Sequence, residues 1–287
     1  RKNETGWLLM TKVYFIEGVP GSGKTTFSKR LEKHLISLGK NVFRFNEGDL
    51  NPLDFAWCSK TDEKTFHKLL ETYKDFKDQI LKYTYISEDK YITAYTKVKI
   101  NQTHKDFYDV FEKHEVYQSN DLSYIKDTHL RQWEKFSNKQ DEAIYIFECV
   151  FFQNHINELM LKFDMNYEQM KTYFSDLLNA ISPIKPIIIY LQPKNINKQI
   201  ELVAKERRTD DPSLYKDWID LVIEYLQKTN YAKVKNYLGY EGFINYLNDR
   251  IDHDKRLLND LNCTYHTFEI DQNHDEVFKL LINQIKE

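Results

Sequence analysis

Short apolar runs alternate along the chain with longer segments in which apolar residues recur every three or four positions. The first run, 13–16 (VYFI), favours a buried strand, and apolar residues at helical spacing predict a helix over 24–38. A second strand is predicted at 42–45 (VFRF). Later strands are predicted at 143–147, 186–191 and 265–269, with helices at 152–163, 167–180, 196–207, 214–230, 241–261 and 275–285. This alternation predicts a parallel sheet with helices on both faces.

The middle of the chain has a different pattern. The stretch 53–182 contains no proline and 49–238 no glycine, which predicts mostly helix with few sharp turns. Apolar residues at helical spacing predict helices over 66–81 and 122–136. The segment 91–100 fits either a short strand or an extended loop. Residues from about 54 to 140 are therefore predicted to form a large helical insertion between strands two and three.

Between the first strand and the first helix, Gly18-x-x-x-x-Gly23-Lys24-Thr25 matches the phosphate-binding P-loop, or Walker A, pattern in full. A loop that wraps a phosphate must bring its backbone closer than a Cβ allows and must visit positive φ, which glycine permits. The inward-facing N–H groups and the start of the following helix then form an anion site. The predicted nucleotide-binding residues are Gly18, Gly21, Ser22, Gly23, Lys24, Thr25 and Thr26.

The side chains of this motif have separate expected roles. Lys24 is expected to reach the β- and γ-phosphates of a nucleoside triphosphate, and the Thr25 hydroxyl is expected to bind Mg²⁺. Thr26 is expected near the α-phosphate. The predicted fold class is therefore α/β, a P-loop NTPase whose five-stranded parallel sheet has the order 2-3-1-4-5.

Composition and charge narrow the class of protein further. At 287 residues and 34.6 kDa, the chain is long enough for one large α/β domain with an insertion. The net charge of −3 argues against an overall basic field that recruits nucleic acid. No apolar run is long enough to span a bilayer, and the N-terminus lacks the apolar core of a signal peptide. The three cysteines form no metal-type spacing, which is typical of reduced thiols in the cytoplasm.

The domain organisation follows from the position of the first strand. Residues 1–9 precede Met10 and are interpreted as a leader or an artificial extension outside the fold. The remaining residues, 10–287, are predicted to form one domain that contains the insertion. A polar segment at about 205–213, after a helix rich in lysine and arginine at its end, is predicted to form a lid.

Charged residues follow several predicted strands and helices. Glu148 ends the strand expected beside the P-loop strand, where a carboxylate can meet Mg²⁺ directly or through water. Glu47 and Asp49 follow strand two, and either could accept a proton from a substrate hydroxyl, with Glu47 favoured. Arg207 and Arg208 could close over the γ-phosphate on the lid. The predicted catalytic residues are Lys24, Glu47, Arg207 and Arg208, and the predicted metal ligands are Thr25 and Glu148.

The order of these parts resembles the P-loop nucleoside and nucleotide kinases, the thymidylate kinase-like group. The resemblance rests on the P-loop, on Glu47, on 147–152 (FECVFF), and on 188–193 (IIYLQP) leading to 205–208 (KERR). In deoxynucleoside kinases the strand-two carboxylate acts as base, so the resemblance gives that role to Glu47. Those kinases carry Glu-Arg-Ser after strand three; here Glu148 keeps the first position, and Cys149 and Val150 replace the other two.

These observations predict a P-loop kinase that uses ATP and Mg²⁺ to transfer the γ-phosphate to a small-molecule acceptor, either nucleoside-like or another metabolite. The alternatives are an ATPase or GTPase switch acting on a protein partner, a nucleic-acid end kinase and a non-catalytic nucleotide-binding scaffold. The acceptor, the preference for ATP over GTP and the choice between Glu47 and Asp49 as base stay open. An exposed helix face over 66–81 would allow a homodimer, and no membrane partner is expected.

Overall fold

The computed structural model describes residues 11–101, 104–139, 141–210, 216–271 and 273–285. The chain forms two compact units. The sheet unit comprises the described residues of 1–44 and 140–287, and the inserted unit comprises 45–139. The predictions for residues 1–9 and for part of the lid, 211–213, fall outside the described residues.

The sheet unit is built on a five-stranded sheet with the order β2-β6-β1-β7-β8. Its strands are β1 (Lys12–Glu17), β2 (Asn41–Phe45), β6 (Ala143–Glu148), β7 (Ile187–Pro193) and β8 (Thr264–Ile270). β1 pairs in parallel with β6 and with β7, and β7 pairs in parallel with β8. Counted along the chain, the five strands have the order 2-3-1-4-5, as the sequence predicts, and the α/β fold class is confirmed.

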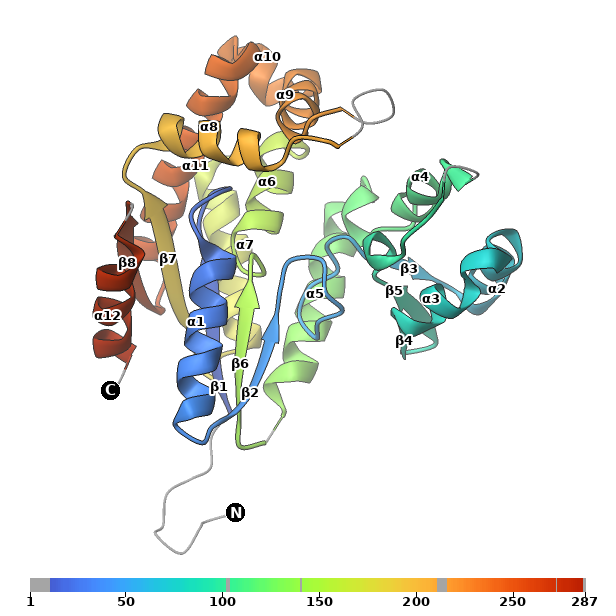
Figure 1. Cartoon of the computed structure of the whole chain (residues 1–287), viewed down its shortest axis with the longest axis horizontal. Helices are drawn as coiled ribbons and strands as arrows, with labels where there is room; N and C mark the ends of the chain where they lie inside the picture. The colour runs from blue at the N-terminus through green and yellow to red at the C-terminus, as the bar shows by residue number, and fades with distance from the viewer. Residues whose placement is uncertain (1–10, 102–103, 140, 211–215, 272, 286–287) are drawn as a thin grey trace, which may run out of the picture. The chain divides into compact units, whose positions relative to one another are not determined.

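Helices cover both faces of this sheet (Figure 1). The helices of the sheet unit are α1 (Lys24–Ser37), α6 (Gln153–Leu161), α7 (Tyr167–Ala180), α8 (Ile196–Glu206), α9 (Trp218–Lys228), α10 (Asn230–Lys235), α11 (Gly239–Asp260) and α12 (His274–Ile285). Alternate strand residues such as Tyr14 and Ile16 pack with α1 and α12 on one face. Phe15 of the opposite face stacks on Phe151, which contacts Phe174 of α7. Because successive side chains of a strand point to opposite faces of the sheet, they pack alternately against the two helical layers.

The inserted unit lies between β2 and β6, as predicted, and combines helices with a small sheet that the sequence predicted only in part, as a possible strand within 91–100. Its helices are α2 (Glu63–Thr72), α3 (Lys77–Lys82), α4 (Phe107–Glu112) and α5 (Leu122–Ser137). Between them, β3 (Ser59–Thr61), β5 (Lys90–Thr93) and β4 (Thr84–Ser87) form an antiparallel sheet in that order. The hairpin between β4 and β5 turns at Glu88 and Asp89, both at positive φ. Because glycine or asparagine usually marks such a turn, the sequence carried no signal for it.

The predicted helix over 66–81 is broken at Tyr73, between α2 and a short 3₁₀ turn at Lys74–Phe76. Its apolar residues do not form an exposed face, which corrects the basis for the predicted homodimer. All of them except Leu81, which is exposed, are buried in the inserted unit's own core, with Phe107 and Phe111 of α4. Phe107 stacks on Phe111, and Tyr73 packs edge-on against Phe107. Aromatic packing therefore accounts for the hydrophobic spacing of this segment.

Candidate active site

The P-loop begins at Gly18, directly after β1, in a conformation that excludes side chains. Gly18 has φ 141°, and a Cβ there would lie 2.2 Å from the backbone oxygen of Leu191 in β7. Gly23 has φ 83° and precedes α1 without a side-chain cap. The first N–H groups of α1 therefore lack a local side-chain acceptor, which is the arrangement of an anion site.

Gly21 lets helix α8 approach the loop closely. Gly21 has φ 79°, and a Cβ there would lie 2.3 Å from Cγ2 of Val203. Arg207 follows one turn later, and its backbone N–H donates to the Val203 oxygen at 2.9 Å. The helix that ends at the predicted lid arginines therefore packs directly on the P-loop.

Lys24 is buried, with 8 % of its surface exposed. Its Nζ donates hydrogen bonds to the backbone oxygens of Gly18 at 2.8 Å and Val19 at 3.0 Å. The amine is thus held inside the loop by two neutral acceptors. Phosphate oxygens carry full negative charge and would form stronger hydrogen bonds with the same amine.

Thr25 and Glu148, the two predicted metal ligands, lie in contact. The Thr25 hydroxyl donates to Oε2 of Glu148 at 2.7 Å. The other carboxylate oxygen, Oε1, accepts from Ser28 and from Arg44, the latter at 3.2 Å. Arg44 also bonds Glu32 at 2.8 Å. Glu148 is 2 % exposed, so this network fixes a buried carboxylate at the end of β6.

The donor set of this site fits a hard cation and a phosphate. Thr25 keeps lone pairs for a cation while its proton is donated to Glu148, and oxygen ligands of this kind suit Mg²⁺. The Ser22 hydroxyl is 1 % exposed and has no hydrogen-bond partner among the described residues. Thr26 is exposed beside Thr25 on the first turn of α1. An orphaned hydroxyl in the loop is consistent with a ligand that supplies its acceptor.

Arg207 and Arg208 are both exposed at the end of α8. The Arg207 guanidinium lies over the Trp218 ring, 5.0 Å from its centroid. Arg208 lines an open cavity of about 350 Å³ together with charged and aromatic side chains. The other lining residues are Glu201, Ala204, Lys205, Asp217, Ile219 and Tyr240.

Glu47 and Asp49 belong to the inserted unit. Oε1 of Glu47 accepts from the Trp57 indole N–H at 3.2 Å, and Trp57 is 47 % exposed. Asp49 forms an ion pair with Lys97 at 2.7 Å and accepts from Asn46. Burial alone would raise the pKa of Asp49, but the hydrogen bonds from Lys97 and Asn46 outweigh it and lower that pKa. A lowered pKa makes Asp49 a weaker proton acceptor than an ordinary aspartate.

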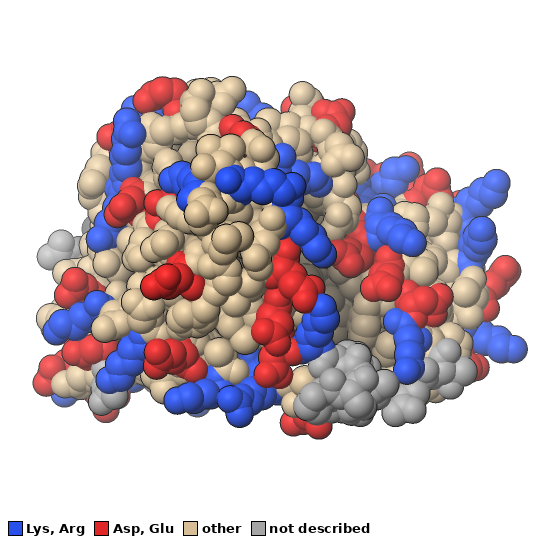
Figure 2. Space-filling model, turned by 90° about the horizontal axis from the view of Figure 1, so that it is seen from above, with Lys and Arg blue, Asp and Glu red and all other residues tan. Residues whose placement is uncertain are grey.

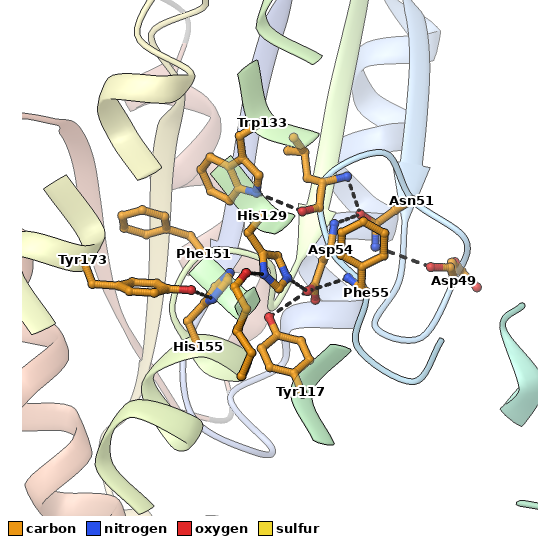
Figure 3. A network of polar contacts seen from close by, with 12 residues as sticks. Asp49, Asn51, Asp54, Phe55, Tyr117, His129, Trp133, Phe151, His155 and Tyr173 are labelled. Atoms are coloured by element: carbon orange, nitrogen blue, oxygen red, sulfur yellow. Dashed lines mark hydrogen bonds and ion pairs between the residues drawn. The ribbon is translucent and has the colours of Figure 1, made fainter. Parts of the chain in front are cut away.

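A second polar network of the inserted unit, around Asp54, is buried. Oδ1 of the buried Asp54 accepts from the Tyr117 hydroxyl at 2.8 Å and lies 3.3 Å from Nε2 of His129 (Figure 3). The Trp133 indole N–H donates to the Leu53 oxygen at 2.8 Å. These aromatic residues are therefore engaged in holding the unit together.

Sequence reasoning missed three residues of the sheet unit that shape the site. Ser28 and Arg44 bind Glu148, and Glu17 accepts backbone N–H groups after β6. The sequence offered one indication for Glu17, because it is a carboxylate at the end of an apolar strand, directly before Gly18. Ser28 and Arg44 carried none, since their partner lies more than 100 positions away.

The strand order and the P-loop define this chain as a P-loop α/β protein. Searches of protein-family models and of curated proteins give no match. Among solved structures, the chain is similar to shikimate kinase from Acinetobacter baumannii in complex with shikimate, at 12 % identity and a TM-score of 0.37. That match covers 98 % of this chain and 99 % of the other.

Two further solved structures are similar at the same level. Shikimate kinase from Bacteroides thetaiotaomicron has 10 % identity and a TM-score of 0.36, covering 96 % of this chain and 99 % of the other. EHV4-TK in complex with TP4A has 12 % identity and a TM-score of 0.31, covering 96 % and 90 %. Similarity at this level defines no activity for this chain. The fold assignment rests on the strand order and the P-loop of the chain itself.

No helix among the described residues is long and apolar enough to cross a membrane.

Proposed function

We propose that this protein is a phosphotransferase that moves the γ-phosphate of ATP to a hydroxyl or phosphate of a small molecule. The observation that carries the proposal is the contact between Thr25 and Glu148 at the mouth of a complete P-loop. When bound, ATP with Mg²⁺ would supply the transferable phosphate and a cation that offsets its charge. Nucleoside-like molecules are among the candidate acceptors.

The residues of the sheet unit would act on the phosphates. Lys24 would exchange the oxygens of Gly18 and Val19 for phosphate oxygens, and the N–H groups at the start of α1 would hold the same anion. Thr25 and Glu148 would hold Mg²⁺, with Ser28 and Arg44 fixing the orientation of the carboxylate. Preorganised charges of this kind stabilise a transferring phosphoryl group without reorganisation.

Two further roles are proposed for groups around the acceptor and the lid. Arg207 and Arg208 follow the helix that packs on Gly21, so they would supply positive charge to the γ-phosphate as the lid closes. Glu47 would take the proton from the acceptor hydroxyl. The proposed location is the cytoplasm, because the three cysteines form no disulfide among the described residues.

The charge distribution favours a small acceptor over a nucleic acid. Figure 2 shows Lys and Arg interspersed with Asp and Glu over the face seen from above. A nucleic-acid end kinase would need a continuous basic groove that follows a phosphate backbone.

The test is transfer of labelled γ-phosphate from ATP–Mg²⁺ to a panel of nucleosides, nucleotides and small metabolites. Lys24→Ala is expected to lower transfer by about 10³-fold, because the amine contributes positive charge at the phosphates. Lys29→Ala, which removes an exposed lysine of the same helix, is the matched control and is expected to keep full activity. Equal turnover in both variants, or release of free phosphate alone, would contradict the proposal.

A further inference from the structure

Glu17 is the last residue of β1, directly before the P-loop, and it is completely buried. Its neighbour Ile16 lies opposite Glu148 in the parallel pairing of β1 with β6. Glu17 therefore lies at the end of the sheet from which the P-loop begins. The adjacent strand, β6, ends at the same level with Glu148, the proposed metal ligand.

The Glu17 carboxylate binds the segment that follows Glu148. Oε1 accepts the backbone N–H of Phe151 at 2.6 Å, and Oε2 accepts the backbone N–H of Gln153 at 3.2 Å. Gln153 is the first residue of α6, and the N-terminal cap of that helix, Phe152, makes no side-chain hydrogen bond. A carboxylate from another element thus satisfies backbone donors at the start of α6, where no local side-chain cap is present.

The corner held in this way is conformationally strained. Cys149, the residue directly after Glu148, has φ 66°, in the left-handed region that side chains other than glycine rarely adopt. Its N–H donates to the Ile16 oxygen at 3.2 Å. Such a conformation persists only where surrounding contacts determine it, and the two bonds to Glu17 lie two and four residues beyond Cys149.

We propose that Glu17 is a positioning residue that fixes the corner between β6 and α6 and thereby aims the Glu148 carboxylate at Thr25. The inference rests on the proposed function, because it concerns how the Mg²⁺ site is held. The Glu17 side chain then connects β1, which leads into the P-loop, to the segment that follows Glu148.

The groups around Glu17 act on its pKa in opposite directions. Burial raises the pKa of Glu17 to about 7, while the backbone N–H groups of Phe151 and Gln153 and the charges of Lys24 and Arg250 act in the opposite direction. Tyr190 also faces this group from β7. A carboxylate retained at this cost of desolvation is typical of functional sites.

The experiment measures ATP binding with and without Mg²⁺ for the full chain and for Glu17→Gln. A glutamine offers one acceptor oxygen and an NH₂ group that would face a second N–H donor, so it cannot hold both amides. We expect the Mg²⁺ enhancement of ATP affinity to fall about tenfold, as for loss of a group that orients a metal ligand. ATP affinity without Mg²⁺ is expected to stay within about twofold, which a general loss of structure would not allow.

Glu158→Gln is the matched control. Glu158 lies on α6 and burial raises its pKa to about 7 as well, but its ion pair is with Lys162, the residue that follows the same helix. The control is expected to keep the Mg²⁺ enhancement. If Glu17→Gln fails to fold, Glu17→Asp replaces it, because a carboxylate shortened by one methylene keeps its charge but cannot reach both N–H groups.

The outcomes separate this inference from the proposed function. A chain with unaltered sequence whose ATP binding is insensitive to Mg²⁺ would overturn both, since there would be no metal site to position. Normal Mg²⁺ enhancement in the unaltered chain and in both Glu17 variants would overturn the role of Glu17 alone. Loss of the enhancement in the Glu17 variants and not in Glu158→Gln would support the inference.

Discussion

Buried carboxylates of the sheet unit and the acidic loop of the inserted unit differ in how readily they ionise. Burial raises the pKa of Glu17 and Glu158 to about 7 and that of Asp254 to about 6. In the inserted unit, burial of Asp49 is outweighed by hydrogen bonds from Lys97 and Asn46, which lower its pKa. At these three carboxylates of the sheet unit the effect of burial on the pKa exceeds that of the donors, whereas at Asp49 the donors exceed burial.

Two particular buried networks, one in each unit, show a similar contrast. In the sheet unit, Nε and Nη2 of the fully buried Arg250 and Oδ1 of Asp254 have no hydrogen-bond partner among the described residues. In the inserted unit, Oδ1 of Asp54 is bonded by Tyr117 and by its own loop at Phe55. Partly satisfied groups with shifted pKa values are typical of functional sites, whereas satisfied groups stabilise a fold.

The largest effect is expected from a pair of glycine variants, which test whether the backbone is more constrained in the sheet unit than in the inserted unit. Gly18→Ala would place a Cβ 2.2 Å from a backbone oxygen, and we expect a loss of about 3 kcal/mol in the free energy of unfolding. Gly48→Ala in the inserted unit also has positive φ, but its nearest contact would be 3.6 Å, so about 1 kcal/mol is expected. Urea unfolding of both variants measures the difference, and equal losses would break the comparison.

An intermediate effect is expected from Glu158→Gln as a function of pH. Since the pKa of Glu158 is raised from 4.5 to about 7, the stability that its protonated form contributes is present below pH 4.5 and is lost as pH rises through 7. Glutamine cannot ionise, so the variant should gain about 2 kcal/mol on the unaltered chain between pH 4.5 and pH 8. Unfolding curves at several pH values test this, and a difference independent of pH would contradict it.

The smallest effect is expected in the inserted unit, from the loss of one hydrogen bond to Asp54. Tyr117→Phe removes the hydroxyl that donates to Asp54 at 2.8 Å, and we expect a loss of about 1 kcal/mol in the free energy of unfolding. The loss is small because the Phe55 N–H still bonds the same oxygen at 2.8 Å. Tyr124→Phe, at a tyrosine that is 40 % exposed, is the control with no expected change. Thermal unfolding measures both, and equal midpoints would show that the Tyr117 hydroxyl contributes no stability.

The sequence predicted the sheet unit more completely than the inserted unit. Strong periodicity placed β1, α1, β6 and β7 within two residues of their observed ends. In the inserted unit, packing ended the helix over 66–81 at Tyr73, and a turn without glycine made the β4–β5 hairpin invisible to sequence signals. The roles of Lys24, Thr25, Glu47, Glu148, Arg207 and Arg208 stay predictions until the variants are measured.

The sequence by itself determined the P-loop, because its glycines, its lysine and its threonine are neighbours whose spacing sets their geometry locally. It also determined the parallel sheet, because apolar periodicity fixes which elements form. Only the tertiary structure decided which groups surround Glu148 and what Glu17 binds. Ser28, Arg44 and Phe151 are separated from their partners by 104 to 134 positions, so their contacts depend on the order in which the sheet brings the strands together.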